Sequence, residues 1–493
     1  MYELNTQEIT GFQLSVDILI HILQNLDAKD ILRVRQASRV LCRATKFKSV
    51  WLVVLDRACE RYGIFKPTFP LDRMSTLDLE NASTSPYKFL RSIKGLDEGD
   101  YPVPYHTSVL RFHSGSRSTG KNTGHDVETL HLIPGGRFLL TSGRSYCLWD
   151  LGYSANVAAK PFPFAEPLYL ESSGFGAVVP GSDGKSIILG TTQRHEMAPQ
   201  HYSINIHIMD LTESQTPTFR LAATLLLGVI TGPVRMYHLG DSLAILWSHP
   251  YVVLWNWAGG VVCKWYVDKL AGIEPQAFVS DNSIFLWDQS SMRVWDLPAG
   301  DAFSPISDYG DIVVIPNRPK ASVQNFSDEG FIMSTTSPWH RSPSADRYLC
   351  QLYPGMPYLR LFSVKSPSES RDDFLPGSYL VPGGESDNEY GPGFRGWIGQ
   401  GVSSLFQCED ELVLCSRSGG EQSALVAMVL KVPKSASLDE IVPFSRALTP
   451  CGSVTPSWSL YQFDFCAFSG RAVYFTPTGD VLVSDYVLPS YGT

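Results

Sequence analysis

The chain has 493 residues, of which 44% are hydrophobic and 18% charged, and this composition predicts a globular protein with more than one hydrophobic core. Its formal net charge of −9 is uneven, because residues 1–100 carry 14 Lys and Arg against 13 Asp and Glu while the remaining residues carry 26 against 36. The acidic remainder argues against a nucleic-acid partner, which requires a basic surface.

The cysteines and the N-terminal residues indicate the compartment. The nine cysteines are scattered, with no C-x-x-C pair and no zinc-finger spacing, so we expect reduced thiols in the cytoplasm or nucleus. Residues 1–12 have neither the basic region nor the small residues of a secretory leader. The longest uncharged part of the first predicted helix is the nine residues 18–26, well short of the roughly 20 that span a bilayer, so no membrane partner is expected.

Residues 14–26, LSVDILIHILQNL, predict a helix that is apolar on nearly every side. Eight of the 13 side chains are apolar, with leucine or isoleucine at every fourth position from Leu14 to Leu26. Such a helix has to be buried on nearly every side. Because a unit of about forty residues rarely has a sufficient core, the helix is covered either by the rest of this chain or by a groove on another protein.

More helices are predicted after this one. Asp27 is a candidate N-cap for a second helix through residues 31–45, with Asp30 three residues on. This helix has an apolar face, and arginines line much of the rest: Ile31, Val34, Ala37 and Leu41 against Arg33, Arg35, Arg39 and Arg43. Further helical stretches are expected over residues 49–63, 74–82 and 86–93, the first of them ending at Gly63.

From about residue 125 the pattern changes to short apolar runs that alternate every second residue and occur in pairs. Each pair predicts a β-hairpin. Four hairpins have short turns and span residues 137–151, 242–257, 283–297 and 471–486. Two looser ones span residues 185–211 and 411–432, and a weaker seventh copy lies at residues 331–364.

The spacing of the tryptophans predicts a β-propeller. Trp255 and Trp295 are 40 residues apart, which fits one four-stranded blade of roughly 40–45 residues, and the 106 residues from Trp149 to Trp255 leave room for two. Seven blades would fill residues 125–490, with the tryptophans packed between sheets; a pair of β-sandwiches is the alternative. Polar segments expected to be solvent loops are residues 316–330, 337–347 and 366–393.

The sequence carries no complete catalytic or metal-binding motif. Residues 115–122, GSRSTGKN, nearly match a phosphate-binding loop, but no amphipathic helix follows Lys121, and Asn122 replaces the hydroxyl that holds Mg²⁺. We find no nucleophile elbow, zinc-protease motif or dinucleotide motif, and the 11 histidines do not cluster with metal-ligand spacing. We therefore expect no catalytic residue, no metal and no cofactor.

Residues 14–51 resemble an F-box. The pattern of that family begins with Leu-Pro; here Leu14 is followed by Ser15, which is still a good N-cap. Its later V-S-R stands as ASR at residues 37–39, and its closing tryptophan is Trp51. The positions that match in between are Asp17, Ile18, Leu19, Ile22, Leu23, Leu26, Asp27, Asp30, Ile31 and Leu32.

The second half resembles a degenerate WD-repeat propeller. Gly124-His125 followed by Trp149-Asp150 carries the paired signature of that family once, and MRVWDL at residues 292–297 repeats its end. An F-box, the stretch 58–80 and a loose propeller are together similar to F-box proteins of mushroom-type fungi. The resemblance implies an α+β multidomain protein, with an all-α F-box domain at 1–55, a helical linker and extended connection at 56–124, and an all-β, seven-bladed propeller at 125–493.

The resemblance also implies a function. F-box proteins bind a Skp-type adaptor and through it a cullin, so this chain would be the non-catalytic substrate-recognition subunit of a Skp–cullin–F-box ubiquitin ligase, whose propeller binds a protein substrate. Trp51 would anchor the F-box internally, and arginines would assist encounter with the acidic adaptor. The alternatives are an interaction scaffold without cullin, and a propeller enzyme or ligand-binding protein. The residues expected to bind the adaptor are Leu14, Ile18, Leu19, Ile22, Leu23, Leu26, Ile31, Leu32, Val34, Arg35 and Arg39.

Overall fold

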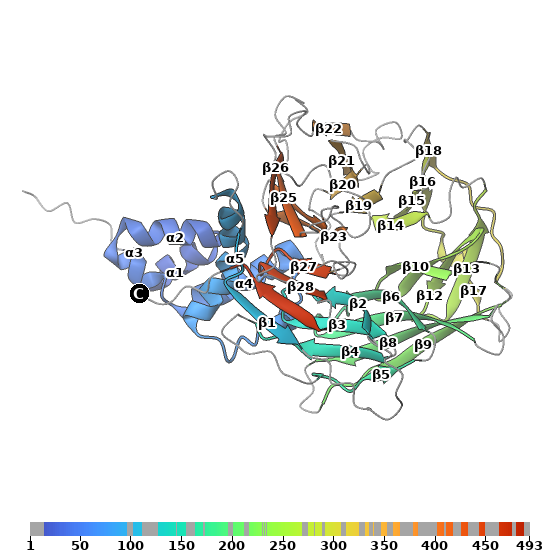
Figure 1. The fold of residues 1–493 in the computed structure, drawn as a ribbon, viewed down its shortest axis with the longest axis horizontal. Coiled ribbons are helices and arrows are strands. Elements are labelled where there is room, and N and C mark those ends of the chain that lie inside the picture. Colours follow the sequence, from blue (N-terminus) through green and yellow to red (C-terminus); the bar gives the residue numbers. More distant parts are fainter. Residues whose placement is uncertain are drawn as a thin grey trace, which may run out of the picture.

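The computed structural model describes residues 14–95 and 102–110 and, with internal gaps, residues 127–487 (Figure 1). The described part begins with helices, which lie at one end of the molecule, and continues with strands (Figure 1). No helix in it has the length and hydropathy required to cross a membrane. The N-terminal helices are α1 (Val16–Gln24), α2 (Ala28–Ala37), α3 (Arg39–Ala44), α4 (Lys48–Tyr62), the short 3-10 helix η1 (Lys66–Thr68) and α5 (Thr76–Lys94).

The sequence predicts α1 correctly but is wrong to continue the second helix through residues 31–45. The Ser15 hydroxyl caps α1 by accepting a hydrogen bond from the Ile18 N–H at 3.4 Å. At Ser38 the backbone is extended, with φ −158° and ψ 159°, so α2 ends and α3 begins there. The Ser38 hydroxyl accepts a hydrogen bond from the Leu41 N–H at 3.2 Å, and this capping competes with continuation of the helix.

The two longer helices, α4 and α5, complete the helical part. α4 ends at Gly63, as predicted, where a φ of 61° places the residue in the left-handed region that glycine adopts without strain. α5 begins with a reciprocal capping box between Ser75 and Asp78. The two helical stretches predicted here are one helix, which continues through Pro86.

In the described part of the chain the strands form seven antiparallel sheets, which we number in chain order. The first sheet contains β2 (Val127–Leu132), β3 (Phe138–Gly143), β4 (Ser145–Asp150) and β5 (Leu168–Tyr169), and the second contains β6 (Ser173–Pro180), β7 (Ser186–Arg194), β8 (Tyr202–Asp210) and β9 (Arg220–Leu227). The third contains β10 (Val234–Leu239), β11 (Leu243–Ser248), β12 (Tyr251–Asn256), β13 (Val261–Tyr266) and β17 (Ser304–Pro305), and the fourth contains β14 (Gln276–Ser280), β15 (Ser283–Trp287), β16 (Ser291–Asp296) and β18 (Ala321–Gln324). The fifth sheet contains β19 (Phe331–Ser334), β20 (Arg347–Leu352), β21 (Tyr358–Val364) and β22 (Ser378–Pro382), and the sixth contains β23 (Val402–Cys408), β24 (Glu411–Arg417), β25 (Leu425–Lys431) and β26 (Pro443–Leu448). The seventh contains β27 (Phe463–Cys466), β28 (Arg471–Phe475), β29 (Val481–Asp485) and β1 (His106–Leu110).

The predicted hairpins are confirmed as neighbouring antiparallel strands, for example β3 with β4 and β28 with β29. The prediction that residues 316–330, 337–347 and 366–393 are solvent loops is wrong in part. β18 pairs with β16 and β22 pairs with β21 as outer strands, and Trp339 is buried against Phe65. An outer strand pairs on one side only and is half solvated, so a polar composition does not exclude it.

Contacts between the sheets follow the order of the chain. The first strands of sheets lie against one another, β6 against β10, β10 against β14, β23 against β27, and β27 against β2. β1, which lies in the segment expected to be a connection, pairs with β29 along residues 106–110. The seventh sheet is therefore completed by a strand that precedes the first sheet in the chain, and it also contacts that first sheet.

The tryptophans pack between sheets, as predicted, but their indole groups differ. Trp149 on β4 donates its Nε1–H to the Thr141 hydroxyl at 3.0 Å. Trp255 and Trp295 hold the corresponding places on β12 and β16 and are buried, yet their Nε1–H groups have no hydrogen-bond partner among the residues that the structure describes. In the strand register, Leu246 has the same position relative to Trp255 as Thr141 has relative to Trp149. Leucine has no hydroxyl group that could accept the indole N–H. The third and fourth sheets therefore bury a tryptophan at the same place as the first sheet does, without the hydrogen bond that Trp149 makes.

We predict that Trp149→Phe lowers the thermal midpoint of the chain more than Trp255→Phe does. Both changes remove similar volume, but only the first breaks a hydrogen bond, which contributes about 1 kcal/mol, whereas the second removes an unsatisfied buried N–H. Differential scanning fluorimetry of the two variants beside the unaltered chain measures the difference. Equal shifts would contradict the assignment.

Candidate protein-binding surface

One side of α1 presents aliphatic side chains to solvent. Ile18 and Ile22, four residues apart, lie along one side of α1 and are 48% and 46% exposed, and Leu14, directly before the N-cap Ser15, is 37% exposed. We call these three residues the α1 stripe. Val16, on the other flank of the helix, is 47% exposed. Single exposed apolar residues are ordinary, whereas a contiguous row is typical of a surface that binds another protein.

The side of α1 between these two flanks is packed inside the chain. Leu19 and Leu23 are buried, as is Ile31 of α2, and they share a core with Val50 and Trp51 of α4. At the edge of this core lie three half-buried side chains: Leu26, Leu32 and Val34. The structure thus separates the apolar residues expected to bind a partner into exposed, half-buried and buried groups, a division that the sequence pattern left open.

Trp51 and Arg35 hold the helices together from within. Trp51 is fully buried, and its indole N–H donates to the Thr45 carbonyl oxygen at 2.8 Å, as expected for an internal anchor. The Arg35 guanidinium lies over the Trp51 ring and donates to both carboxylate oxygens of Glu80 on α5, at 2.9 and 2.6 Å. Arg35, which the sequence placed among the partner-binding residues, is therefore occupied within the chain, where it joins α2 to α5.

Exposed basic residues lie on α3, which contacts α1. Arg39 and Arg43 are exposed and form no ion pair with any residue that the structure describes, and Val40 beside them is 54% exposed. Val40 is not among the residues that the sequence predicts to bind a partner. A helical wheel drawn through residues 31–45 assumes one continuous helix, whereas the break at Ser38 changes the phase of α3 and turns Val40 outward.

The helices are attached to the seventh sheet by aromatic packing. Figure 1 shows α1, α2 and α3 away from the sheets, with α4 and α5 in between. Tyr62 and Phe69 both pack on Phe468, in the turn after β27, with ring centroids 5.8 and 6.2 Å apart, and Phe89 of α5 packs on Phe465 of β27 at 5.1 Å. Helices and sheets therefore share one hydrophobic core, and the α1 stripe lies at the outer end of it.

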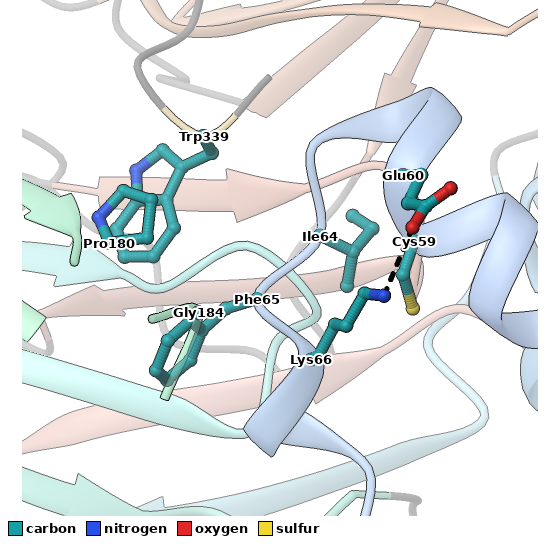
Figure 2. Close-up of a pocket in the computed structure, with 8 residues that line it drawn as sticks. All are labelled: Cys59, Glu60, Ile64, Phe65, Lys66, Pro180, Gly184 and Trp339. Atoms are coloured by element: carbon teal, nitrogen blue, oxygen red, sulfur yellow. Dashed lines mark hydrogen bonds and ion pairs between the residues drawn. The ribbon is translucent and has the colours of Figure 1, made fainter. Parts of the chain in front are cut away.

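A pocket lies where α4 and η1 meet the second sheet, and Figure 2 shows the residues that line it. Lys66 donates to Glu60 at 3.1 Å at its edge, and Trp339 and Pro180 also line it. Burial raises the pKa of the Cys59 thiol far above its usual range, which favours its protonated form. Within the described residues no group of three or more metal-binding side chains gathers, here or elsewhere.

Comparison with known proteins identifies the helical unit. Residues 12–52 match the F-box domain family, so the chain carries an F-box domain ahead of its β-sheets. No curated protein matches the chain. Among solved structures, the chain is similar to the C-terminal WD40 domain of Sif2, with 9% identity, a TM-score of 0.38, and 78% of this chain and 99% of that one covered. It is also similar to Hsv2 of Kluyvelomyces marxianus, with 13% identity, a TM-score of 0.30, and 52% and 71% covered.

The strand order, the pairing of β1 with β29 and the contacts between first strands define how the sheets are arranged. The F-box match, by contrast, spans α1, α2 and α3 and reaches into α4, and so includes every residue of the α1 stripe.

We predict that Arg35→Met destabilises the chain and that Arg33→Met does not. The first change leaves the Glu80 carboxylate, whose side chain is 16% exposed, without its bidentate partner, at a cost of about 1–2 kcal/mol. Arg33 pairs with Asp30 at the surface, with its side chain 75% exposed, and such pairs contribute little. Thermal midpoints of the two variants test this; a comparable fall in both would show that Arg35 does not join α2 to α5 in solution.

Proposed function

We propose that the chain is the substrate-recognition subunit of a Skp–cullin–F-box ubiquitin ligase and that a Skp-type adaptor binds the α1 stripe. The observation that carries this proposal is an F-box match in which three aliphatic side chains in a row remain more than a third exposed. Burying a fully exposed aliphatic side chain stabilises by about 1.5–3 kcal/mol, so covering a half-exposed one contributes about 1 kcal/mol. An apolar groove on the adaptor would provide that cover.

The residues expected to bind the adaptor would then act in three ways. Direct contact would come from the α1 stripe, with half-buried side chains at its rim: Leu26, Leu32 and Val34. The buried residues would position α1 and α2 from inside: Leu19, Leu23 and Ile31. Arg35 would position α2 against α5, whereas Arg39 and Arg43 would present positive charge beside Val40 and favour encounter with an acidic partner.

We further propose that the seven sheets are the blades of a closed seven-bladed propeller that binds a protein substrate. The pairing of β1 with β29 supports closure, because it joins the seventh sheet to the segment that precedes the first. On this proposal the F-box domain covers residues 1–55, and the propeller takes in residues 106–110 from the connection 56–124 as well as the sheets that follow. Similarity to F-box proteins of mushroom-type fungi remains a prediction.

The proposed mechanism is proximity rather than chemistry by this chain. A substrate held on the propeller would be kept near a ubiquitin-carrying enzyme bound at the far end of the cullin, which raises the effective concentration of the two reactants. Because helices and sheets share a core, the distance between adaptor and substrate would be set by packing rather than by a loose linker. Such a subunit would act in the cytoplasm or nucleus.

We predict that Ile18→Asp combined with Ile22→Asp lowers the affinity of the full chain for a purified Skp-type adaptor by about a hundredfold or more, since both carboxylates would enter an apolar groove. Calorimetric titration measures the affinity, and circular dichroism checks that the variant is folded. Tyr169→Asp combined with Tyr266→Asp adds the same charge at exposed positions on the sheets and should leave the affinity unchanged. Full binding by a folded stripe variant would refute the site.

The same complex separates the alternatives. A substrate-recognition subunit brings a cullin down together with the adaptor, whereas an interaction scaffold retains the adaptor alone. A propeller enzyme or ligand-binding protein would keep its activity or its ligand in the variant that carries Ile18→Asp and Ile22→Asp, because both changes lie outside the sheets. Co-purification of cullin with the unaltered chain, and its loss with the stripe variant, is the expected result.

A further inference from the structure

The C-terminal end of α1 takes its last hydrogen bond from another helix. An α-helix leaves its last four carbonyl oxygens without partners inside the helix, and in α1 these belong to His21, Ile22, Leu23 and Gln24. The side-chain amide of Asn25 and the backbone N–H groups of Asn25 and Leu26 donate to the first three, at 2.8, 3.0 and 3.1 Å. The fourth carbonyl oxygen, that of Gln24, accepts from the Arg57 guanidinium of α4 at 2.6 Å.

Three further hydrogen bonds attach the same corner to α4. Arg57 also donates to the carbonyl oxygen of Leu26, between α1 and α2, at 2.8 Å. One turn further along α4, Arg61 donates to the Asp27 carboxylate at 3.1 Å. In the opposite direction, the Gln24 side chain donates to the Ser49 carbonyl oxygen near the start of α4, at 3.2 Å. We call these bonds, together with that from Arg57 to Gln24, the corner clamp.

The clamp supplies what apolar packing cannot. α1 has nine residues, and helices shorter than about 12–15 residues are marginal in water by themselves. Burial of Leu19 and Leu23 is not directional, so it holds the middle of α1 against α4 and leaves the last turn free to fray. A hydrogen bond from a charged donor is both directional and strong, and a cation at a helix C-terminus also interacts favourably with the helix dipole. Arg57 provides both effects.

We propose that Arg57 is a positioning residue for adaptor binding, which holds the last turn of α1 and so keeps Ile22 in line with the rest of the α1 stripe. This inference rests on the proposed function. Arg57 is half-buried and would act through α1 rather than by touching the adaptor. It also lies outside residues 12–52, which match the F-box family, so the surface defined by that match would depend on a residue beyond it.

The helix that carries Arg57 also contacts the sheets. α4 continues to Tyr62, which packs on Phe468 in the turn after β27 with ring centroids 5.8 Å apart. One helix therefore bonds the end of α1 on one side and packs on the seventh sheet on the other. On this proposal the corner clamp sets the direction of the α1 stripe relative to the sheets as well as its local order.

Calorimetric titration of the full-length variants with a purified Skp-type adaptor tests the proposal. We expect Arg57→Met to weaken binding about tenfold, because a smaller fraction of the chain holds α1 in the binding arrangement. Arg57→Lys keeps a cationic donor at the end of α1 and should recover most of the affinity. Arg220→Met, at an exposed arginine at the start of β9, is the matched control and should change nothing.

Hydrogen exchange without the adaptor separates positioning from direct contact and from general instability. In Arg57→Met the amides in the last turn of α1 should exchange at least tenfold faster, while the amides of the sheets keep their rates. Trp149→Phe, which is expected to destabilise the chain from within the first sheet, should leave both the exchange of α1 and the affinity for the adaptor unchanged.

The outcomes distinguish this inference from the proposed function. An unaltered chain that does not bind the adaptor refutes both. If the unaltered chain binds, the inference alone is overturned by any of three results: Arg57→Met binds equally well, it loses affinity without faster exchange in α1, or Arg57→Lys recovers nothing. A loss of affinity in Trp149→Phe equal to that in Arg57→Met would also overturn it, because binding would then follow overall stability.

Discussion

The pairing of β1 with β29 is the constraint on which the rest of the structure depends, because it ties the segment that follows the helices to the last strand of the chain. Buried Arg471 reinforces the same junction. Its guanidinium donates to both carboxylate oxygens of Asp485, at 2.6 and 3.1 Å. It also donates to two carbonyl oxygens of the first sheet's connections, those of Gly136 between β2 and β3 and of Gly152 just after β4, at 2.7 Å each. The first and seventh sheets are thereby held together, and the aromatic side chains of α4 and α5 have a fixed surface to pack on.

This shared core also explains why the α1 stripe stays in water. Leu19 and Leu23 already fill the space between α1 and α4, against the fully buried Trp51. A well-packed core does not accept further side chains without strain, so Ile18 and Ile22 cannot turn inward by rotating the helix. The exposed row is therefore a consequence of how the helical unit is anchored.

Local signals predicted local structure, and distant contacts escaped them. The hairpins follow from apolar runs with a period of two, and the end of α4 follows from a glycine. Residues close in sequence determine both features. The partners of the arginines do not follow from neighbouring residues. Arg61 donates to the Asp27 carboxylate that was expected to cap α2, and Arg35 donates to Glu80, which is 45 residues further along the chain. β1 has no sequence neighbour to pair with, so no hairpin signal exists for it. Both flanks of α1 are apolar, so tertiary packing decides which of its residues stay exposed to solvent.

The helical nature of the α1 stripe sets what the stripe can bind. In a helix the backbone groups are already paired, so a partner of the stripe must match the shape of Leu14, Ile18 and Ile22.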